Sequence, residues 1–225
     1  MKRRSMVHMA AAAAAAACGG VARVSADRRD GEDATAPSTK GLASHYLDIS
    51  RAMLARMHDT QSAYLLEGAY AIASAVKKGG RVWSNWNMGH NTEFDVYPGR
   101  HGAPDFVTVN YVAEKAKKGD VLLVTYYSGP MEDVVKKGVY VIGGPDPYSL
   151  DGHGEEPFRD DLVNARFRQY ANIWIDTGST RVDGAIELPG APVPVCPVSP
   201  VLGMTSFWMM MADAWIPVLR TEPSN

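Results

Sequence analysis

Apolar residues recur every three or four positions in two early segments of the chain, the spacing that lines one face of a helix. The first segment spans residues 46–60 and the second residues 66–76. Two lysines and the pair Gly79-Gly80 follow the second segment, and a basic last turn with glycine behind it is a common helix end. The pattern therefore predicts two helices in this region.

Short apolar runs replace the helical spacing after Gly80. Residues 81–86 form a β-compatible run, residues 121–125, 139–142 and 172–176 form three apolar or nearly apolar runs, and residues 185–188 form a final short one. Continuous apolar runs are typical of strands buried on both faces of a parallel sheet. We expect a strand at each of these places.

Helical stretches separate the expected strands. Residues 102–118 are expected to be loop and then helix, residues 131–137 a short helix, and residues 157–170 a mixed polar helix. Residues 204–214 are apolar nearly all round, which predicts a buried or interface helix. Strands alternating with helices predict an α/β fold with a doubly wound parallel sheet, and ligands bind such sheets at the carboxyl ends of the strands.

The N-terminus has the layout of a signal peptide. Three basic residues, Lys2, Arg3 and Arg4, precede an uncharged, alanine-rich run, and no acidic residue occurs before Asp27. The run is far shorter than the ~20 residues that span a bilayer. The string from Arg3 to Val7 resembles a twin-arginine export signal. We expect export to the periplasm or to a membrane surface, with a cytoplasmic protein as the alternative.

Two processing sites compete within the predicted signal peptide of residues 1–26. Cleavage after Ala26 would release a soluble chain, whereas Ala17-Cys18-Gly19 resembles a lipoprotein box that would place a lipid anchor on Cys18. Residues 27–41 are polar and are expected to form a flexible linker before a single domain over residues 42–220. Removal of residues 1–26 takes away four basic residues and no acidic ones, so the net charge falls from −2 to −6.

Composition narrows the function classes. The 225 residues are 46% hydrophobic with a net charge of −2, a composition typical of globular proteins. The sequence has no basic tract, which argues against nucleic acid as the main partner. Cys196 is the only cysteine besides Cys18, so once Cys18 is acylated or removed no internal disulfide can form. The sequence lacks the glycine-rich nucleotide fingerprints, the serine hydrolase elbow and the zincin motif, and we predict neither a cofactor nor a metal.

Two of the expected loops have side chains suited to sugar chemistry. His90 and Glu93 follow the first strand, where an imidazole and a carboxylate could move protons between adjacent carbons of a sugar. Ser128-Gly129-Pro130 follows the second, where helix N–H groups could meet an anion or a hydroxyl. The alternatives are structural: Glu93 at a solvated helix start, and Ser128 as a helix cap. His101 and His153 have no metal-ligand spacing with these residues.

Several segments in order resemble the sugar isomerase (SIS) domain, in the group related to phosphoheptose isomerases. They are Gly79-Gly80, Gly89-His90, residues 119–123 reading G-D-V-L-L with Ser128-Gly129 behind them, residues 171–176, and residues 197–199 before the apolar helix. The resemblance covers about residues 46–214. It implies a three-layer sandwich with a five-stranded parallel sheet of flavodoxin- or Rossmann-like topology, a homodimer or homotetramer, and a phosphosugar site at the strand carboxyl ends.

The resemblance also implies the site residues. Glu93 would be the base and His90 the assisting acid of an aldose–ketose isomerisation. The substrate contacts would be Gly89, Asn91, Thr92, Tyr127, Ser128, Gly129 and Ser199.

Three loops differ from the family pattern at hydroxyl positions. Asn91 stands where the family has serine, Tyr126 stands at a further serine, and Val198 and Pro200 interrupt a threonine- and serine-rich loop. Fewer hydroxyls weaken a phosphate cradle, while Trp83, Trp86, Tyr126 and Tyr127 suit stacking on an uncharged sugar, with a core role as the alternative for both tryptophans. We expect an exported protein that binds a sugar or sugar derivative. The alternative is an inactive sensor or assembly module in which residues 204–214 contact a partner subunit.

Overall fold

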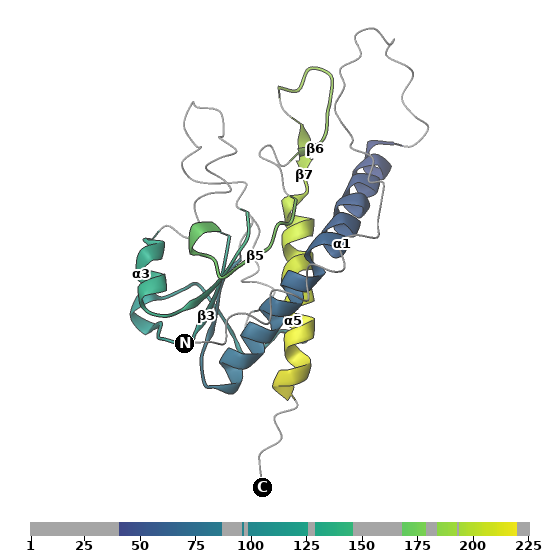
Figure 1. Ribbon diagram of the computed structural model, residues 1–225. Coiled ribbons are helices and arrows are strands. Elements are labelled where there is room, and N and C mark those ends of the chain that lie inside the picture. Colours follow the sequence, from purple (N-terminus) through teal and green to yellow (C-terminus); the bar gives the residue numbers. More distant parts are fainter. Residues whose placement is uncertain are drawn as a thin grey trace, which may run out of the picture. The chain divides into compact units, whose positions relative to one another are not determined.

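Five short parallel strands form the centre of the fold (Figure 1). The computed structural model describes residues 41–86, 96, 99–125, 129–145, 168–178, 184–192 and 194–219, all within one compact unit, Thr39–Asn225. The predicted leader, residues 1–26, lies outside the described residues.

The order of the strands is that of flavodoxin-like sheets. The strands are β1 (Val82–Asn85), β2 (Val107–Val109), β3 (Val121–Val124), β4 (Tyr140–Gly143) and β5 (Ile173–Trp174). They lie in the order β2-β1-β3-β4-β5, and every pair is parallel. This is the 2-1-3-4-5 order of doubly wound sheets. The predicted α/β class and parallel five-stranded sheet are confirmed.

One of the five strands is not the one predicted. Residues 107–109, expected as loop and helix, form the edge strand β2, whose Val107 pairs with Val82 of β1. Only the 3-10 turn η1 (Ala113–Lys115) follows. The predicted strand over residues 185–188 is instead part of β6 (Gly184–Ile186), which pairs antiparallel with β7 (Val195–Pro197) in a separate sheet. β-branched residues favour pairing with an open sheet edge, and this overrides the weak helical spacing.

The two predicted N-terminal helices are one continuous helix. Helix α1 runs from Leu42 to Lys77, and Gln61 and Leu65 keep its buried face unbroken across the expected gap. The predicted stop at Gly79-Gly80 is confirmed. Gly79 has a φ of 73°, and the Gly80 N–H donates to the carbonyl of Ala75 across 2.8 Å, which closes the last turn.

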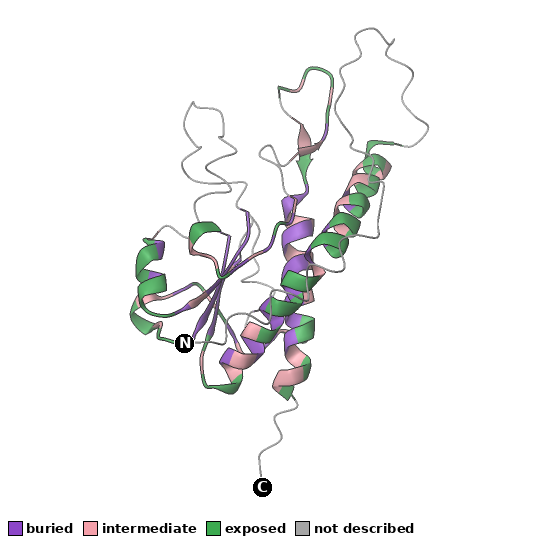
Figure 2. Cartoon of the chain, viewed as in Figure 1, coloured by how far each residue is buried: buried purple, intermediate pink, exposed green. Residues whose placement is uncertain are grey.

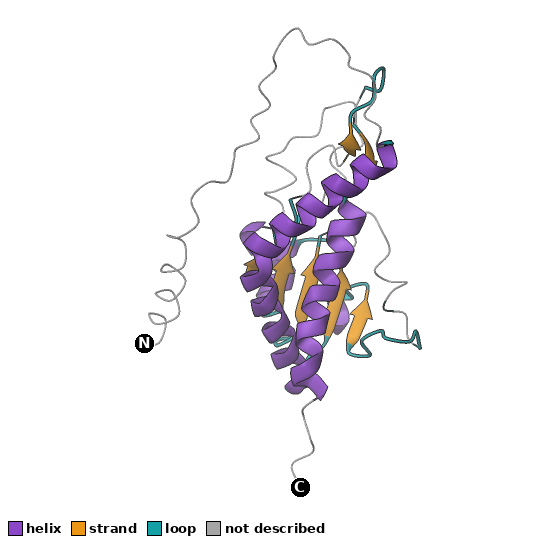
Figure 3. Ribbon diagram, turned by 90° about the vertical axis from the view of Figure 1, so that its right-hand side faces the viewer, coloured by secondary structure: helices purple, strands orange, loops and turns teal. Residues whose placement is uncertain are grey.

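Helix α5 (Ser199–Leu219) packs against α1, and the two helices cover one face of the sheet (Figure 3). It begins before the predicted residue 204, because Pro200 is compatible with a first helical turn. By length and composition α5 is the helix among the described residues that could cross a membrane, and 39% of its apolar stretch is buried within the fold. Buried residues of both helices and the sheet form the larger core cluster, which includes Leu65, Ile72, Leu123, Ile142, Phe207 and Met210.

The opposite face of the sheet has a smaller cover. Helix α3 (Met131–Lys136) and η1 lie on this side, together with the 3-10 turn η3 (Arg168–Tyr170). Alternate strand residues point here and form a second cluster with α3: Trp83, Leu122, Val124, Val141, Met131 and Val134. The strands are buried on both sides (Figure 2), so the predicted three layers are present.

Candidate functional site

The carboxyl ends of three strands meet at one edge of the sheet. The Thr125 N–H donates to the Asn85 carbonyl across 3.1 Å, and the Gly144 N–H donates to the Val124 carbonyl across 3.0 Å. These bonds continue the β1–β3 and β3–β4 ladders by one residue beyond the strands. The loops predicted to hold the site therefore leave from a single edge, as the topology requires.

Trp86 fills the space beneath this edge. Its side chain is fully buried, and its indole Nε1 donates to the carbonyl of Gly203 in α5 across 3.0 Å. A Cβ on Gly144 would lie 2.8 Å from Cη2 of Trp86, so the loop after β4 rests directly on the indole ring. The ring connects β1, β4 and the first turns of α5 from inside the core.

Trp83 is buried as well, on the other face of the sheet. Its indole Nε1 donates to the carboxylate of Asp120 across 2.9 Å. Both rings lie in the core, so the alternative of a core role for Trp83 and Trp86 is confirmed and their stacking on a sugar is excluded. Tyr126 and Tyr127, the other two aromatic candidates, lie outside the described residues.

Asn85 is a site-edge residue that the sequence analysis did not select. It ends β1, and its Oδ1 accepts a hydrogen bond of 2.6 Å from the N–H of Tyr111. Asn110 precedes that contact with a φ of 61°, and its N–H donates to the Ser84 carbonyl. The chain leaving β2 is thereby attached to the end of β1. Two asparagines, Asn85 at the end of a predicted strand and Asn110 after an apolar run, were the sequence signals for this turn, because asparagine favours turns and tolerates the left-handed region.

The second predicted loop reaches α3 at Gly129 and Pro130. Pro130 is the N-cap residue of α3 and makes no side-chain cap hydrogen bond. Ser128, the cap that the sequence offered as an alternative, lies outside the described residues. Glu132 and Asp133 occupy the first turn. Two carboxylates at a helix N-terminus already interact with its dipole and repel an incoming anion. Of the two predicted ligands for this helix start, the hydroxyl is therefore favoured over the anion.

A hydrogen bond between Tyr170 of η3 and Glu132 of α3 shifts the pKa of both side chains. The hydroxyl of Tyr170 in η3 donates a short hydrogen bond to Oε1 of Glu132. This bond lowers the pKa of Glu132 below its ordinary value, and the same bond raises the pKa of Tyr170. Glu132 is exposed and Tyr170 is half-buried, and the bond joins η3 to the first turn of α3.

The loop after β5 is held by α1. Oε1 of Gln61 accepts the N–H of Asp176 across 3.0 Å, and Oδ1 of Asp176 accepts the N–H of Gly178 across 2.9 Å. Arg56 lies 3.5 Å from the other carboxylate oxygen of Asp176. The loop is thus fixed before it enters the segment after Gly178. Asp176, half exposed at a strand carboxyl end, was inside a predicted strand and was not selected as a site residue.

Ser199 is the predicted contact that the structure describes most fully. It is the first residue of α5 and is fully buried. The preceding strand β7 is anchored to α1, because the hydroxyl of Tyr46 donates to the Pro197 carbonyl across 2.9 Å. Since Trp86 bonds to Gly203 one turn further along, Ser199 lies at the same edge of the sheet as the end of β1.

Most of the predicted site lies outside the described residues. This is so for the predicted acid and base, His90 and Glu93, and for Gly89, Asn91, Thr92, Tyr127, Ser128 and the lipidation candidate Cys18. Gly129 and Ser199 remain, and both flank the carboxyl edge. Among the described residues, no group of three or more histidine, cysteine, aspartate or glutamate side chains could hold a metal ion.

The chain is similar in structure to solved proteins, among them a phosphoheptose isomerase. The phosphoheptose isomerase of Neisseria gonorrhoeae has 10% sequence identity and a TM-score of 0.47, over 78% of this chain and 96% of that one. No family model matches the sequence, and no curated protein matches it.

Proposed function

We propose that the chain binds a sugar or a sugar phosphate at the carboxyl edge of its sheet. The observation behind the proposal is the convergence of three loops on one edge: those after β1 and β3, and the start of α5. In a doubly wound parallel sheet this edge is the ligand site. Of the sequence segments that resemble sugar isomerase domains, those containing Gly129 and Ser199 flank this edge.

An uncharged sugar or sugar hydroxyl fits the α3 side of this edge better than a phosphate. Glu132 and Asp133 place negative charge at the first turn of α3. A phosphate could still be held at the α5 side, where Ser199 lies and where α5 has no acidic residue in its first turn. The proposed substrate contacts are Gly89, Asn91, Thr92, Tyr127, Ser128, Gly129 and Ser199.

For catalysis we assign Glu93 as the base that removes a proton from the carbon next to a carbonyl. His90 would donate a proton to the carbonyl oxygen, which gives an enediol. His90 would then take the proton of the neighbouring hydroxyl, and Glu93 would return its proton to the former carbonyl carbon, which completes an aldose–ketose isomerisation. Both residues belong to the loop after β1, whose first residue, Trp86, is held by Gly203. This anchoring would keep the loop over the sheet edge.

Thermal unfolding with a panel of neutral sugars and sugar phosphates tests binding. We expect at least one compound to raise the melting temperature at millimolar concentration, with Ser199→Ala reducing the shift. Glu93→Gln is expected to abolish turnover of any isomerised sugar while leaving the shift in place. No shift with any compound would contradict the binding proposal. A shift without turnover would instead favour a sensor.

Export is a separate part of the proposal. The basic start and the alanine-rich run support a signal peptide cleaved after Ala26 or just before Cys18, with a periplasmic or lipid-tethered product. Mass spectrometry of the purified protein's N-terminus distinguishes diacylglyceryl-Cys18 from a free Asp27. An intact Met1 in the cytoplasm would contradict export.

A further inference from the structure

The starts of β1, β3 and β4 lie side by side, at the edge of the sheet opposite the candidate site. Val82 pairs with Val121, and Val121 pairs with Tyr140, so the segments that precede these three residues meet at this edge. Two of the turns are joined directly, because the Gly119 N–H donates to the Gly138 carbonyl across 3.2 Å. The topology thus brings three separate segments of the chain into one surface.

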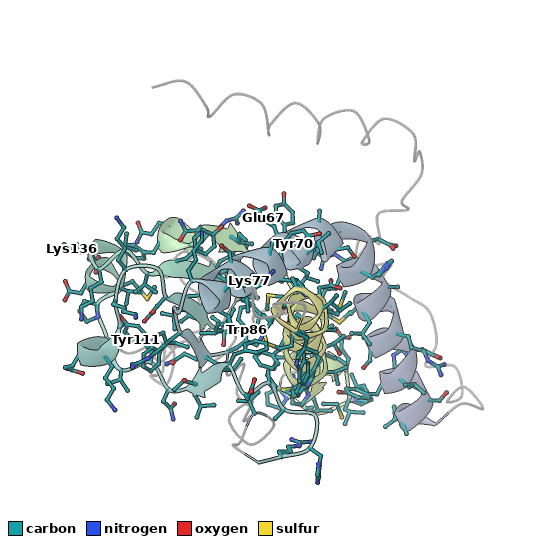
Figure 4. The ribbon with its side chains drawn as sticks, turned by 90° about the horizontal axis from the view of Figure 1, so that it is seen from below. Glu67, Tyr70, Lys77, Trp86, Tyr111 and Lys136 are labelled. Atoms are coloured by element: carbon teal, nitrogen blue, oxygen red, sulfur yellow. The ribbon has the colours of Figure 1, made fainter. Side chains whose placement is uncertain are left out.

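Basic side chains gather on this surface, which we call the amino edge and define as residues 77–81, 113–120 and 133–139. The first segment has two lysines and an arginine, the second three lysines and the third two lysines, and all eight side chains are exposed. They include seven of the nine lysines of the chain. Figure 4 looks onto this end of the molecule, with Lys77 of α1 and Lys136 of α3 labelled. The sequence shows no basic tract, because strands and helices separate the three segments along the chain.

Acidic residues compensate little of this charge. Asp133 lies 3.6 Å from Lys136 and forms an ion pair with it. Asp120 is buried, and its carboxylate accepts the indole N–H of Trp83 inside the core. Glu114 is the remaining carboxylate in the three segments, and it is exposed. The amino edge is therefore strongly positive in a chain whose net charge is −2.

Backbone carbonyls hold some of the cations in place without cancelling their charge. Nζ of Lys117 donates to the Gly79 carbonyl across 3.3 Å, and Nζ of Lys137 donates to the Ala113 carbonyl. Helix dipoles favour basic residues in the last turns of α1 and α3. The lysines of residues 113–120 follow a single 3-10 turn, whose dipole is too small to account for three of them. The positive charge at this edge therefore exceeds what the helix ends need.

Exposed apolar side chains of α5 lie next to the amino edge. Lys77 and Ile216 line one groove between α1 and α5. Trp215 packs edge-on against Phe106, just before β2, with the ring centroids 6.3 Å apart. The last turns of α5 thus end at this side of the sheet, where Ile216 is 55% exposed and Leu219 is 73% exposed.

We infer that the amino edge and the end of α5 together bind the surface of an anionic membrane. Clustered lysines are attracted to anionic headgroups, and exposed isoleucine and leucine enter the boundary between headgroups and acyl chains. The ammonium group of lysine is a compact, strongly hydrated charge, which suits mobile headgroups that need no fixed geometry. Binding through the amino edge would leave the candidate sugar site, at the opposite edge, open to solvent.

Nucleic acid is the other polyanion that a basic surface suits. It is disfavoured because the three segments of the amino edge contain no aromatic residue on which a base could stack, and one arginine among seven lysines offers little bidentate contact to phosphate. Asp213 is the one charged residue of α5, and it lines the same groove as Lys77. Its negative charge therefore lies beside a lysine and opposes the headgroups only weakly.

Co-sedimentation of the full chain with vesicles tests the inference. The vesicles are pure phosphatidylcholine or an equimolar mixture with phosphatidylglycerol, and every protein carries Cys18→Ser so that no lipid anchor contributes. The edge variant combines Lys78→Gln, Lys115→Gln and Lys118→Gln, whose side chains have no ion pair or hydrogen bond in the part of the chain that the structure describes. At about fivefold per lysine, we expect its affinity for the mixed vesicles to fall by about 100-fold. Added salt should weaken wild-type binding.

Matched controls separate the amino edge from net charge and from general hydrophobicity. Arg51→Gln, Arg56→Gln and Arg168→Gln together remove the same charge from exposed positions away from the amino edge, and this protein should bind like wild type. Leu219→Ser should weaken binding at least about threefold, whereas Leu42→Ser, at the other end of the helix pair and 56% exposed, should not. The basic leader is the same in all proteins, so differences between them report the described domain.

Far-UV circular dichroism shows that each variant is folded before its binding is compared. Equal affinity of wild type and the edge variant for the mixed vesicles would overturn the inference, as would equal binding of wild type to both kinds of vesicle. Binding of a labelled DNA duplex through the same lysines, without binding to vesicles, would assign the amino edge to nucleic acid instead. None of these results depends on whether the protein binds a sugar, so failure of one proposal leaves the other standing.

Discussion

The indole Nε1 of Trp83 donates to the carboxylate of Asp120 across 2.9 Å, inside the core. The same carboxylate accepts the backbone N–H groups of Arg81 at 2.9 Å and Lys117 at 3.1 Å. Asp120 precedes β3, Arg81 precedes β1, and Lys117 follows η1. One buried carboxylate therefore aligns the starts of two neighbouring strands, at the edge opposite the candidate site.

Asp120→Asn should lower the free energy of unfolding by about 1–3 kcal/mol. The amide has only one accepting oxygen, so its NH2 group must face at least one of the three donors. Urea unfolding measures the loss. Asp133→Asn, exposed on α3, is the control and should change stability by less than about 0.5 kcal/mol. An equally small change for Asp120→Asn would show that the three bonds do not contribute as argued.

How far the sequence predicts this fold depends on the range of the interactions. Continuous apolar runs predicted β3 and β4 because strands buried on both faces need no partner-specific pattern. β2 was missed because a three-residue edge strand, with only Val107 buried, has too few residues to show a period. The helix break expected after residue 60 was wrong, because packing against α5 and the sheet stabilises α1 across that position.

In the candidate site too, features set by the local pattern were predictable and features set by long-range contacts were not. The topological edge was predictable, since alternating strands and helices imply a parallel sheet. A core role for Trp83 and Trp86 was among the alternatives, but their hydrogen-bond partners were not predictable, because Trp86 bonds to Gly203, 117 positions away, and Trp83 to Asp120, 37 positions away. No local spacing contains such contacts. The hold of Gln61 on the β5 loop was unpredictable for the same reason.

The Glu132–Tyr170 bond predicts a pH dependence with two limbs. The lowered pKa of Glu132 adds stability that is complete above its ordinary pKa of 4.5 and is lost as the pH falls through the lowered value. The raised pKa of Tyr170 adds stability that is complete below its ordinary pKa of 10.0 and is lost as the pH rises through the raised value. Tyr170→Phe should weaken both limbs.

Melting temperatures across the pH range, compared between wild type and Tyr170→Phe, measure these limbs. Glu132→Gln should remove the acid limb and move the ultraviolet titration of Tyr170 toward lower pH. Tyr64→Phe, exposed on α1, is the matched control. Identical acid profiles for wild type and Tyr170→Phe would refute the coupling.

Gln61→Ala should lower the free energy of unfolding by about 1–3 kcal/mol, because the N–H of Asp176 loses its acceptor. Gln61→Glu keeps an accepting oxygen at the same reach and should recover part of the loss. Arg56→Ala removes only an exposed ion pair and should cost less than about 1 kcal/mol. If Arg56→Ala proved the more damaging of the two alanine variants in denaturant unfolding, the ion pair and not the amide would hold the loop.

Gly144→Ala should be destabilising through Trp86 specifically. The added methyl group would lie 2.8 Å from Cη2 and 3.2 Å from Cζ2 of the indole, and both atoms are absent from phenylalanine. We expect Gly144→Ala to lower the free energy of unfolding by about 1–3 kcal/mol through overpacking.

Trp86→Phe should also lower the free energy of unfolding, because it removes the bond to Gly203 and leaves a void beneath the sheet edge. In the double variant the methyl group occupies part of that void, so the combined loss should be smaller than the sum by about 1 kcal/mol. Denaturant unfolding of the four proteins gives this coupling energy. Strict additivity would mean that the loop after β4 does not rest on Trp86, and that the edge of the sheet is supported in some other way.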